Sequence, residues 1–183
     1  HFIGVWWSGS ENDVAPAGDA ADGYLSGAFH APGDDFPVHD DIKKHLYDKN
    51  NGLGDRDRIG EVLYNRGIVA AMWTAEAIRN AQKIHKTGEV TGAMVRDGFE
   101  QLDVDEKRLA ELGLPNFTIP VKVTCANHGG SGNVALQQWD AKAGKWKIVT
   151  KFYEPMRDIT APLIAADSGA YAKENGIPER ECN

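Results

Sequence analysis

A glycine-rich stretch in the second half of the chain, residues 127–132 (NHGGSG), has the composition of an anion-binding loop. Glycines free backbone N–H groups to hold an oxyanion during acyl transfer. That chemistry also needs a serine in a Gly-x-Ser-x-Gly elbow, and residues 129–133 (GGSGN) fail at the last position. A phosphate-binding loop should open a helix, whereas a strand is expected to follow here. The sequence therefore favours a plain glycine-rich turn.

Histidines and carboxylates offer a second kind of chemistry, metal binding. His39 and His45 flank Asp40 and Asp41, but a separation of six does not place both histidines on one helix face. Residues 55–58 (DRDR) lack the glycine and the terminal glutamate of an EF-hand loop. We therefore expect no metal site and no cofactor, and a solvated helix face around the two histidines.

The remaining candidates are aromatic and cationic. Trp6 and Trp7 are adjacent, so on a strand they point to opposite faces. One can pack in the core while the other walls a ligand cleft. Arg66, within residues 64–67 (YNRG), has a guanidinium that could take a carboxylate in two parallel bonds. Two alternatives stay open, which are two core tryptophans and a structural ion pair for Arg66.

The chain has two cysteines, Cys125 and Cys182. A disulfide between them would tie down a C-terminal tail that otherwise frays. It would contribute roughly 4 kcal/mol if unstrained, and it would imply an oxidising compartment. The alternative is two unrelated thiols, since the spacing fits no zinc or CxxC motif.

Composition limits the class of protein. The 183 residues are 42% hydrophobic and include five Trp, five Tyr and six Phe, which suits one domain or two small lobes and excludes disorder. The formal charge of −7 argues against nucleic acid as a partner. No apolar run reaches about 18 residues, so no transmembrane helix is expected. Because the first seven residues start inside an apolar run, we expect a fragment of a longer protein.

The hydrophobic patterns predict the elements that must position these residues. Strands are expected over residues 2–7, 24–30, 117–125, 134–139 and 146–153. Helices are expected over residues 37–49, 59–82, 90–102, 105–112 and 159–175, the last with Gly176 as its C-cap. The strand over 2–7 should be buried, and the helix over 59–82 should be mostly buried because apolar residues surround it. This order of elements predicts an α/β fold.

Four stretches share their spacing and pattern with one family. They are residues 2–24, the helix with Tyr64 and residues 70–81, the strand 119–123 with residues 128–129, and the hairpin with residues 137–140 and 145–146. Together they resemble the C-terminal half of a periplasmic solute-binding protein of the branched-chain amino acid type, the receptor of ABC importers. The resemblance implies the type I periplasmic-binding fold, with two Rossmann-like lobes. Residues 1–30 would lie in lobe 2 and residues 31–118 in lobe 1, and residues 119–183 would return to lobe 2 with the C-terminal helix and tail.

The resemblance also implies a ligand site. Amino-acid binders of this family use an acidic residue against the ligand ammonium where this chain has Trp6, which cannot neutralise an ammonium as a carboxylate does. A flat aromatic carboxylate is therefore expected, with its ring on the indole and its carboxylate on Arg66. Family members that take up aromatic acids look similar in the two regions concerned. The implied ligand-binding residues are Trp6, Trp7, Ser8, Tyr64, Asn65 and Arg66.

The expected function is that of a periplasmic, substrate-binding component of an ABC importer, which closes on its ligand about a hinge without chemistry. Its partners would be the small-molecule ligand, the membrane permease and the missing N-terminal half of the same protein. Two alternatives remain, a ligand-sensing regulatory domain of the same fold and an α/β hydrolase that uses residues 128–132 (HGGSG) as its oxyanion loop. Turnover of a generic aryl ester would distinguish the hydrolase from both binders.

Overall fold

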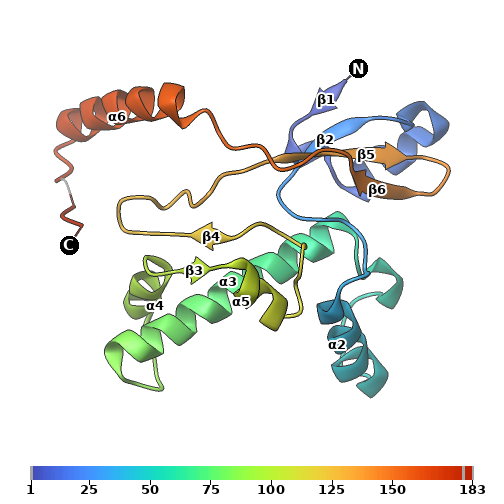
Figure 1. Cartoon of the computed structure of the whole chain (residues 1–183), viewed down its shortest axis with the longest axis horizontal. Coiled ribbons are helices and arrows are strands. Elements are labelled where there is room, and N and C mark those ends of the chain that lie inside the picture. Colours follow the sequence, from blue (N-terminus) through green and yellow to red (C-terminus); the bar gives the residue numbers. More distant parts are fainter. Residues whose placement is uncertain (1, 179, 183) are drawn as a thin grey trace.

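The computed structural model describes residues 2–178 and 180–182. Figure 1 shows a small sheet and a mostly helical body, with a last helix standing apart from the helical body. The helices are α1 (Glu11–Val14), α2 (Pro37–His45), α3 (Val62–His85), α4 (Gly92–Phe99), α5 (Glu106–Glu111) and α6 (Arg157–Glu174). The strands are β1 (Ile3–Gly4), β2 (Leu25–Ala28), β3 (Asp103–Val104), β4 (Val121–Lys122), β5 (Ala135–Asp140) and β6 (Lys145–Ile148). Among the described residues, no helix combines the length and apolar character needed to cross a membrane.

One body is a four-stranded sheet with the order β1-β2-β5-β6. β1 runs parallel to β2, whereas β5 runs antiparallel to both β2 and β6. In the β5–β6 hairpin Trp139 lies opposite Trp146, and their ring centroids are 5.4 Å apart. Both indoles are buried with Val14 and Ala21, and Val62 from the start of α3 joins them. The sheet therefore has its own small core, which α3 contacts with its N-terminal end.

The long helix α3 is the axis of the other body. Its buried face packs Val69 and Met72 into a core with Phe117, which is fully buried. α4 approaches α3 so closely that a Cβ at Gly98 would lie 2.0 Å from the carbonyl oxygen of Ala77. Only glycine fits this contact, so Gly98→Ala would force the two helices apart.

One connection between the bodies leads from β2 to α2. The segment between α5 and β4 of the helical body runs beside it. The Thr118 hydroxyl donates to the Phe29 carbonyl at 2.9 Å, and the Ala31 N–H donates to the Phe117 carbonyl at 2.7 Å. A connection such as β2–α2 is a segment about which two packed bodies can turn.

The prediction of a buried strand over residues 2–7 is wrong. Only Ile3–Gly4 forms a strand, and Trp6–Ser8 forms a turn of 3₁₀ helix. Phe2 is 87% exposed and Ile3 is 62% exposed. β1 is an edge strand, and its apolar composition alone could not show whether anything in this chain covers it.

Two predictions about helices also differ from the structure. α3 is buried along one face only, and Leu63 and Ala70 on its other faces are exposed. His39 lies in the core instead of on a solvated face, because its Nε2 atom contacts Asn65 Oδ1 at 2.8 Å. The helix ends are closer to expectation, since α6 ends at Glu174 and Gly176 follows it with a positive φ of 62°.

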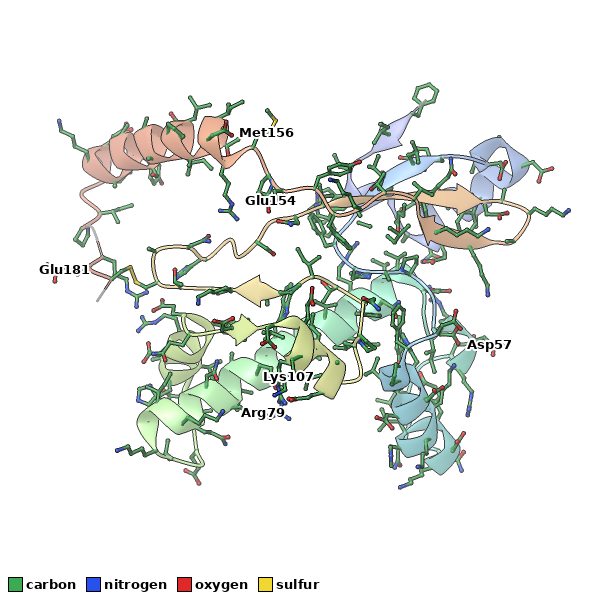
Figure 2. All side chains as sticks on the ribbon, viewed as in Figure 1. Asp57, Arg79, Lys107, Glu154, Met156 and Glu181 are labelled. Atoms are coloured by element: carbon green, nitrogen blue, oxygen red, sulfur yellow. A yellow bond between two sulfur atoms is a disulfide. The ribbon has the colours of Figure 1, made fainter. Side chains whose placement is uncertain are left out.

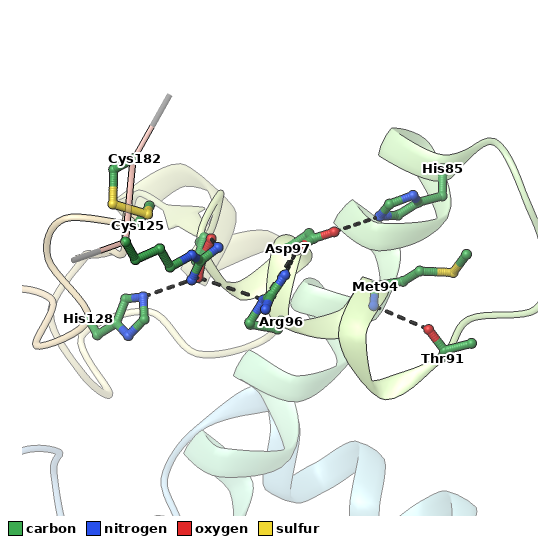
Figure 3. A network of polar contacts seen from close by, with 10 residues as sticks. His85, Thr91, Met94, Arg96, Asp97, Cys125, His128 and Cys182 are labelled. Atoms are coloured by element: carbon green, nitrogen blue, oxygen red, sulfur yellow. Dashed lines mark hydrogen bonds and ion pairs between the residues drawn. A yellow bond between two sulfur atoms is a disulfide. The ribbon is translucent and has the colours of Figure 1, made fainter. Parts of the chain in front are cut away.

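The C-terminal tail returns to the helical body. A disulfide joins Cys125, just after β4, to Cys182 near the end of the chain. Beside it, Arg180 makes two hydrogen bonds with the carboxylate of Glu100. The residues after α6 are therefore tied to the end of α4, and Figure 3 shows this contact from close by.

Candidate functional site

Aromatic side chains and one arginine gather where β1 and β2 end beside the first turns of α3. The rings of Trp6 and Trp7 are stacked, with centroids 4.2 Å apart and planes inclined by 29°. Phe29 meets Trp6 edge to face at 5.8 Å. The guanidinium carbon of Arg66 lies over the Trp6 ring, 4.3 Å from its centroid. Trp6 and Arg66, which the sequence singled out separately, are therefore in contact, and we call these four residues the Trp6 cluster.

Local hydrogen bonds fix the turn that carries the two tryptophans. The Ser8 hydroxyl donates to the Val5 carbonyl at 2.9 Å and also contacts the Tyr24 hydroxyl at 2.9 Å. The Ser26 hydroxyl donates to the same Val5 carbonyl at 3.2 Å. A Cβ at Gly4 would lie 2.0 Å from the Tyr24 hydroxyl and 2.1 Å from the Ser8 hydroxyl, so a larger residue there would displace this pair of hydroxyls. Ser8 thus shapes the turn that presents Trp6 and Trp7.

Arg66 is half-buried, and its guanidinium is not neutralised by an ion pair within the described chain. Partial burial lowers the pKa of the Arg66 guanidinium, and the nearby negative charge of Asp13 opposes that shift. Asp13 is itself occupied, because its carboxylate accepts hydrogen bonds from the Ser10 N–H at 2.9 Å and the Ser10 hydroxyl at 2.7 Å. Among residues 2–178 and 180–182, no carboxylate lies within salt-bridge distance of Arg66. Its guanidinium can therefore accept a carboxylate from outside the chain.

Asn65 has a different place from the one the resemblance implies. It is fully buried, and its side-chain N–H groups donate to the carbonyls of Ala31 at 3.1 Å and Gly33 at 2.8 Å. Its Oδ1 atom is occupied by the ring of His39 at 2.8 Å. Because both ends of the amide are engaged, Asn65 holds the β2–α2 connection against α3 and leaves no group for a ligand.

Tyr64 also lies apart from the Trp6 cluster. Burial raises the pKa of the Tyr64 hydroxyl, and neighbouring Tyr47 adds to the rise. Residues two positions apart on a helix lie on nearly opposite sides, so Tyr64 faces Tyr47 while Arg66 faces Trp6. The structure therefore brings Trp6, Trp7 and Arg66 together and separates Tyr64 and Asn65 from them.

Phe29 and His30 are neighbours of the site that the sequence analysis did not single out. Phe29 is 40% exposed beside Trp6, and His30 is buried with its ring stacked on Phe117. The alternation over residues 24–30 was the available signal, because it places one of two adjacent residues on the open face of a strand. The order of the strands decides which face that is, and the sequence does not show that order.

The glycine-rich turn is bound by a residue that follows it in the chain. The carbonyl oxygens of Gly130 and Ser131 accept hydrogen bonds from the Arg157 guanidinium. A groove of about 770 Å³ opens beside this turn, lined by Lys122 and Arg157 among others. Within the part of the chain that the structure describes, no three or more His, Cys, Asp or Glu side chains are grouped to hold a metal ion.

Comparisons with known proteins place this geometry in a wider fold. No protein-family model matches the chain, and no curated protein is significantly similar to it. A structure from the Pseudomonas fluorescens group, described as an ABC transporter permease, is 36% identical, with a TM-score of 0.93 over 100% of this chain and 44% of that one. A branched-chain amino acid ABC transporter from Thermus thermophilus with bound valine is 23% identical, with a TM-score of 0.62 over 86% of this chain and 40% of that one. The chain thus spans less than half the length of each neighbour.

These likenesses confirm the predicted fold class. The chain is a mixed α/β structure that forms part of a type I periplasmic-binding-protein fold, and it is similar to proteins of ABC transporters. The predicted likeness to aromatic-acid binders stays a prediction, as do the lobe boundaries at residues 1–30, 31–118 and 119–183. Residues 1, 179 and 183 of those ranges lie outside the described residues.

Proposed function

We propose that this chain is part of the periplasmic substrate-binding component of an ABC importer, and that it binds a small aromatic carboxylate without converting it. The observation that carries the proposal is the Arg66 guanidinium, which lies 4.3 Å from the centroid of the Trp6 ring without a carboxylate of the described chain to pair with. A cation held on an indole beside further aromatic rings suits a ligand that is both flat and anionic.

The contacts within the Trp6 cluster suggest how such a ligand lies. Trp6 already has Trp7 and Arg66 against its ring, whereas Trp7 is 72% exposed. The ligand ring would therefore stack on Trp7, next to Phe29, and its carboxylate would reach Arg66. The start of α3 adds little attraction, because the Val62 N–H already donates to the Glu11 carboxylate at 3.1 Å.

Closure about the β2–α2 connection would complete the site. The Trp6 cluster draws residues from the sheet and from α3, so a ligand bound there contacts both bodies and favours the closed arrangement. The closed form would then dock on the membrane permease. The rest of the cleft would come from the missing N-terminal half, which we call the complement and define as the polypeptide corresponding to the part of the Pseudomonas neighbour outside the alignment.

The test is calorimetric titration of benzoate into this chain co-expressed with the complement. We predict that Arg66→Gln weakens benzoate binding by more than about tenfold, which corresponds to roughly 1.4 kcal/mol. The matched control is Arg56→Gln, because Arg56 is an exposed arginine that pairs with Asp48. Equal benzoate affinity in Arg66→Gln and the unmodified protein would overturn the role of Arg66, and failure of the unmodified protein to bind aromatic acids would overturn the ligand class.

A further inference from the structure

The helix α6 is apolar and uncovered. None of its 18 residues is buried, even though several of them are apolar. Ile159, Leu163 and Ile164 are 52%, 62% and 64% exposed. Figure 2 shows side chains projecting from α6 on more than one side. A helix with apolar residues on several sides is normally buried, and most helices in proteins owe their stability to tertiary packing. Something outside this chain is therefore needed to cover α6.

Both ends of α6 are nevertheless fastened to other parts of the chain. At its start, Arg157 donates to the carbonyl of Ser131 at 2.8 Å and also to that of Gly130. After its end, the disulfide from Cys182 to Cys125 fixes the tail close to α4. A segment that is held at both ends and bare between them has the form of a strap.

The strap stands over an open space. The groove of about 770 Å³ is lined on one side by Glu154 and Asp158, at the start of α6, and on the other by Asp103 and Lys122 of β3 and β4. A second bare surface lies at β1, where Phe2 is 87% exposed. Exposed apolar surfaces of this kind mark places where polypeptide packs.

We propose that α6 and residues 175–178 and 180–182 form a strap that closes over the complement, with the Cys125–Cys182 disulfide as its fastening. The Pseudomonas neighbour matches all of this chain, α6 included, with a TM-score of 0.93, while this chain covers only 44% of it. The same elements therefore occur there in a chain of which more than half lies outside the alignment. That additional polypeptide is the occupant to which the bare α6 points. The inference rests on the proposed function because both assume the same complement. It does not depend on the binding of any ligand.

The experiment measures complement binding in the absence of any ligand. This chain, tagged, is co-expressed with the complement, and the mass, the dissociation rate and the hydrogen exchange of α6 amides are recorded. The strap predicts a one-to-one complex in which α6 amides become protected. Leu163→Asp should weaken the complex by more than about tenfold. Leu53→Asp is the matched control, because Leu53 is a fully exposed loop residue of the other end of the helical body.

The fastening is tested with the double variant Cys125→Ser/Cys182→Ser. It should dissociate from the complement at least about fivefold faster, because α6 is then held at one end only. The proposal is overturned if Leu163→Asp binds as the unmodified chain does, if α6 amides stay unprotected in the complex, or if the chain alone forms a dimer that protects α6. Protection of α6 without benzoate binding would support the strap and contradict only the ligand proposal.

Discussion

His30 is a buried histidine at the edge of the Trp6 cluster. Burial lowers the pKa of the His30 ring below its usual value of 6.5, a hydrogen bond to the Ala31 carbonyl opposes this, and the positive charge of Arg66 lowers the pKa further. The folded chain therefore holds His30 neutral in a range where the unfolded chain binds a proton. Protonation of this one side chain should cost stability next to the ligand site.

The free energy of unfolding should consequently fall as the pH drops below about 6.5 and through the folded pKa of His30. His30→Gln removes this contribution, so the variant should lose less stability than the unmodified chain between about pH 7 and pH 5. Urea unfolding at each pH measures the difference. His45→Gln, at the exposed end of α2, is the control and should keep the unmodified pH dependence. Parallel pH profiles for His30→Gln and the unmodified chain would contradict the assignment.

At this scale the sequence identified residue types better than their positions. Trp6 and Arg66 stood out because an indole in place of a carboxylate and an arginine in a helix surrounded by apolar residues both need an explanation. Tyr64 and Asn65 were grouped with Arg66 by adjacency, whereas the helix turns them toward Tyr47 and His39. The burial of His39 was not predictable, because its partner Asn65 lies 26 positions away.

At the scale of elements, the start of α3 joins the two bodies. Val62 packs in the core of the sheet and receives a cap from Glu11, while Asn65 binds the connection from β2 to α2. Burial raises the pKa of the Glu11 carboxylate, and its hydrogen bond from Val62 opposes the rise. The first turn of α3 is therefore the place where hinge geometry is set.

Removal of the Asn65 amide should be costly. Asn65→Ala leaves the Gly33 carbonyl and the His39 ring without their partner in a buried setting, so we expect a loss of about 2–4 kcal/mol in the free energy of unfolding. Asn12→Ala, at an exposed position in α1, should cost less than about 0.5 kcal/mol. Urea unfolding compares the two variants, and a similar small loss in both would show that Asn65 does not clamp the connection.

Elements with a strong period were the most predictable. The long helix over residues 59–82 and the final helix over 159–175 are present as α3 and α6, and the Trp139–Trp146 hairpin is present as β5 and β6. The expected burial of residues 2–7 and of most of α3 failed for a different reason. An apolar pattern indicates that a surface is buried, but among the described residues no segment packs over the exposed residues within 2–7 or over the exposed faces of α3.

At the scale of the whole molecule, the chain has two cores with uncovered surfaces between and beside them. It spans 44% of one neighbour and 40% of the other, so each neighbour contains further parts of the fold that this chain does not include. This explains why an α/β class could be predicted from the order of elements while the complete cleft could not. The residues that would face Trp7 and Arg66 across a closed cleft belong to the complement in our proposal.

The most direct test of the ligand proposal is a tryptophan-fluorescence titration of this chain assembled with the complement. Benzoate and cinnamate are compared with leucine and valine, with thermal stability recorded for each. We predict a saturable change with the aromatic acids, because their rings contact exposed Trp7, and no change with either aliphatic amino acid. A saturable response to leucine or valine, with none to the aromatic acids, would contradict the Trp6–Arg66 account of the ligand.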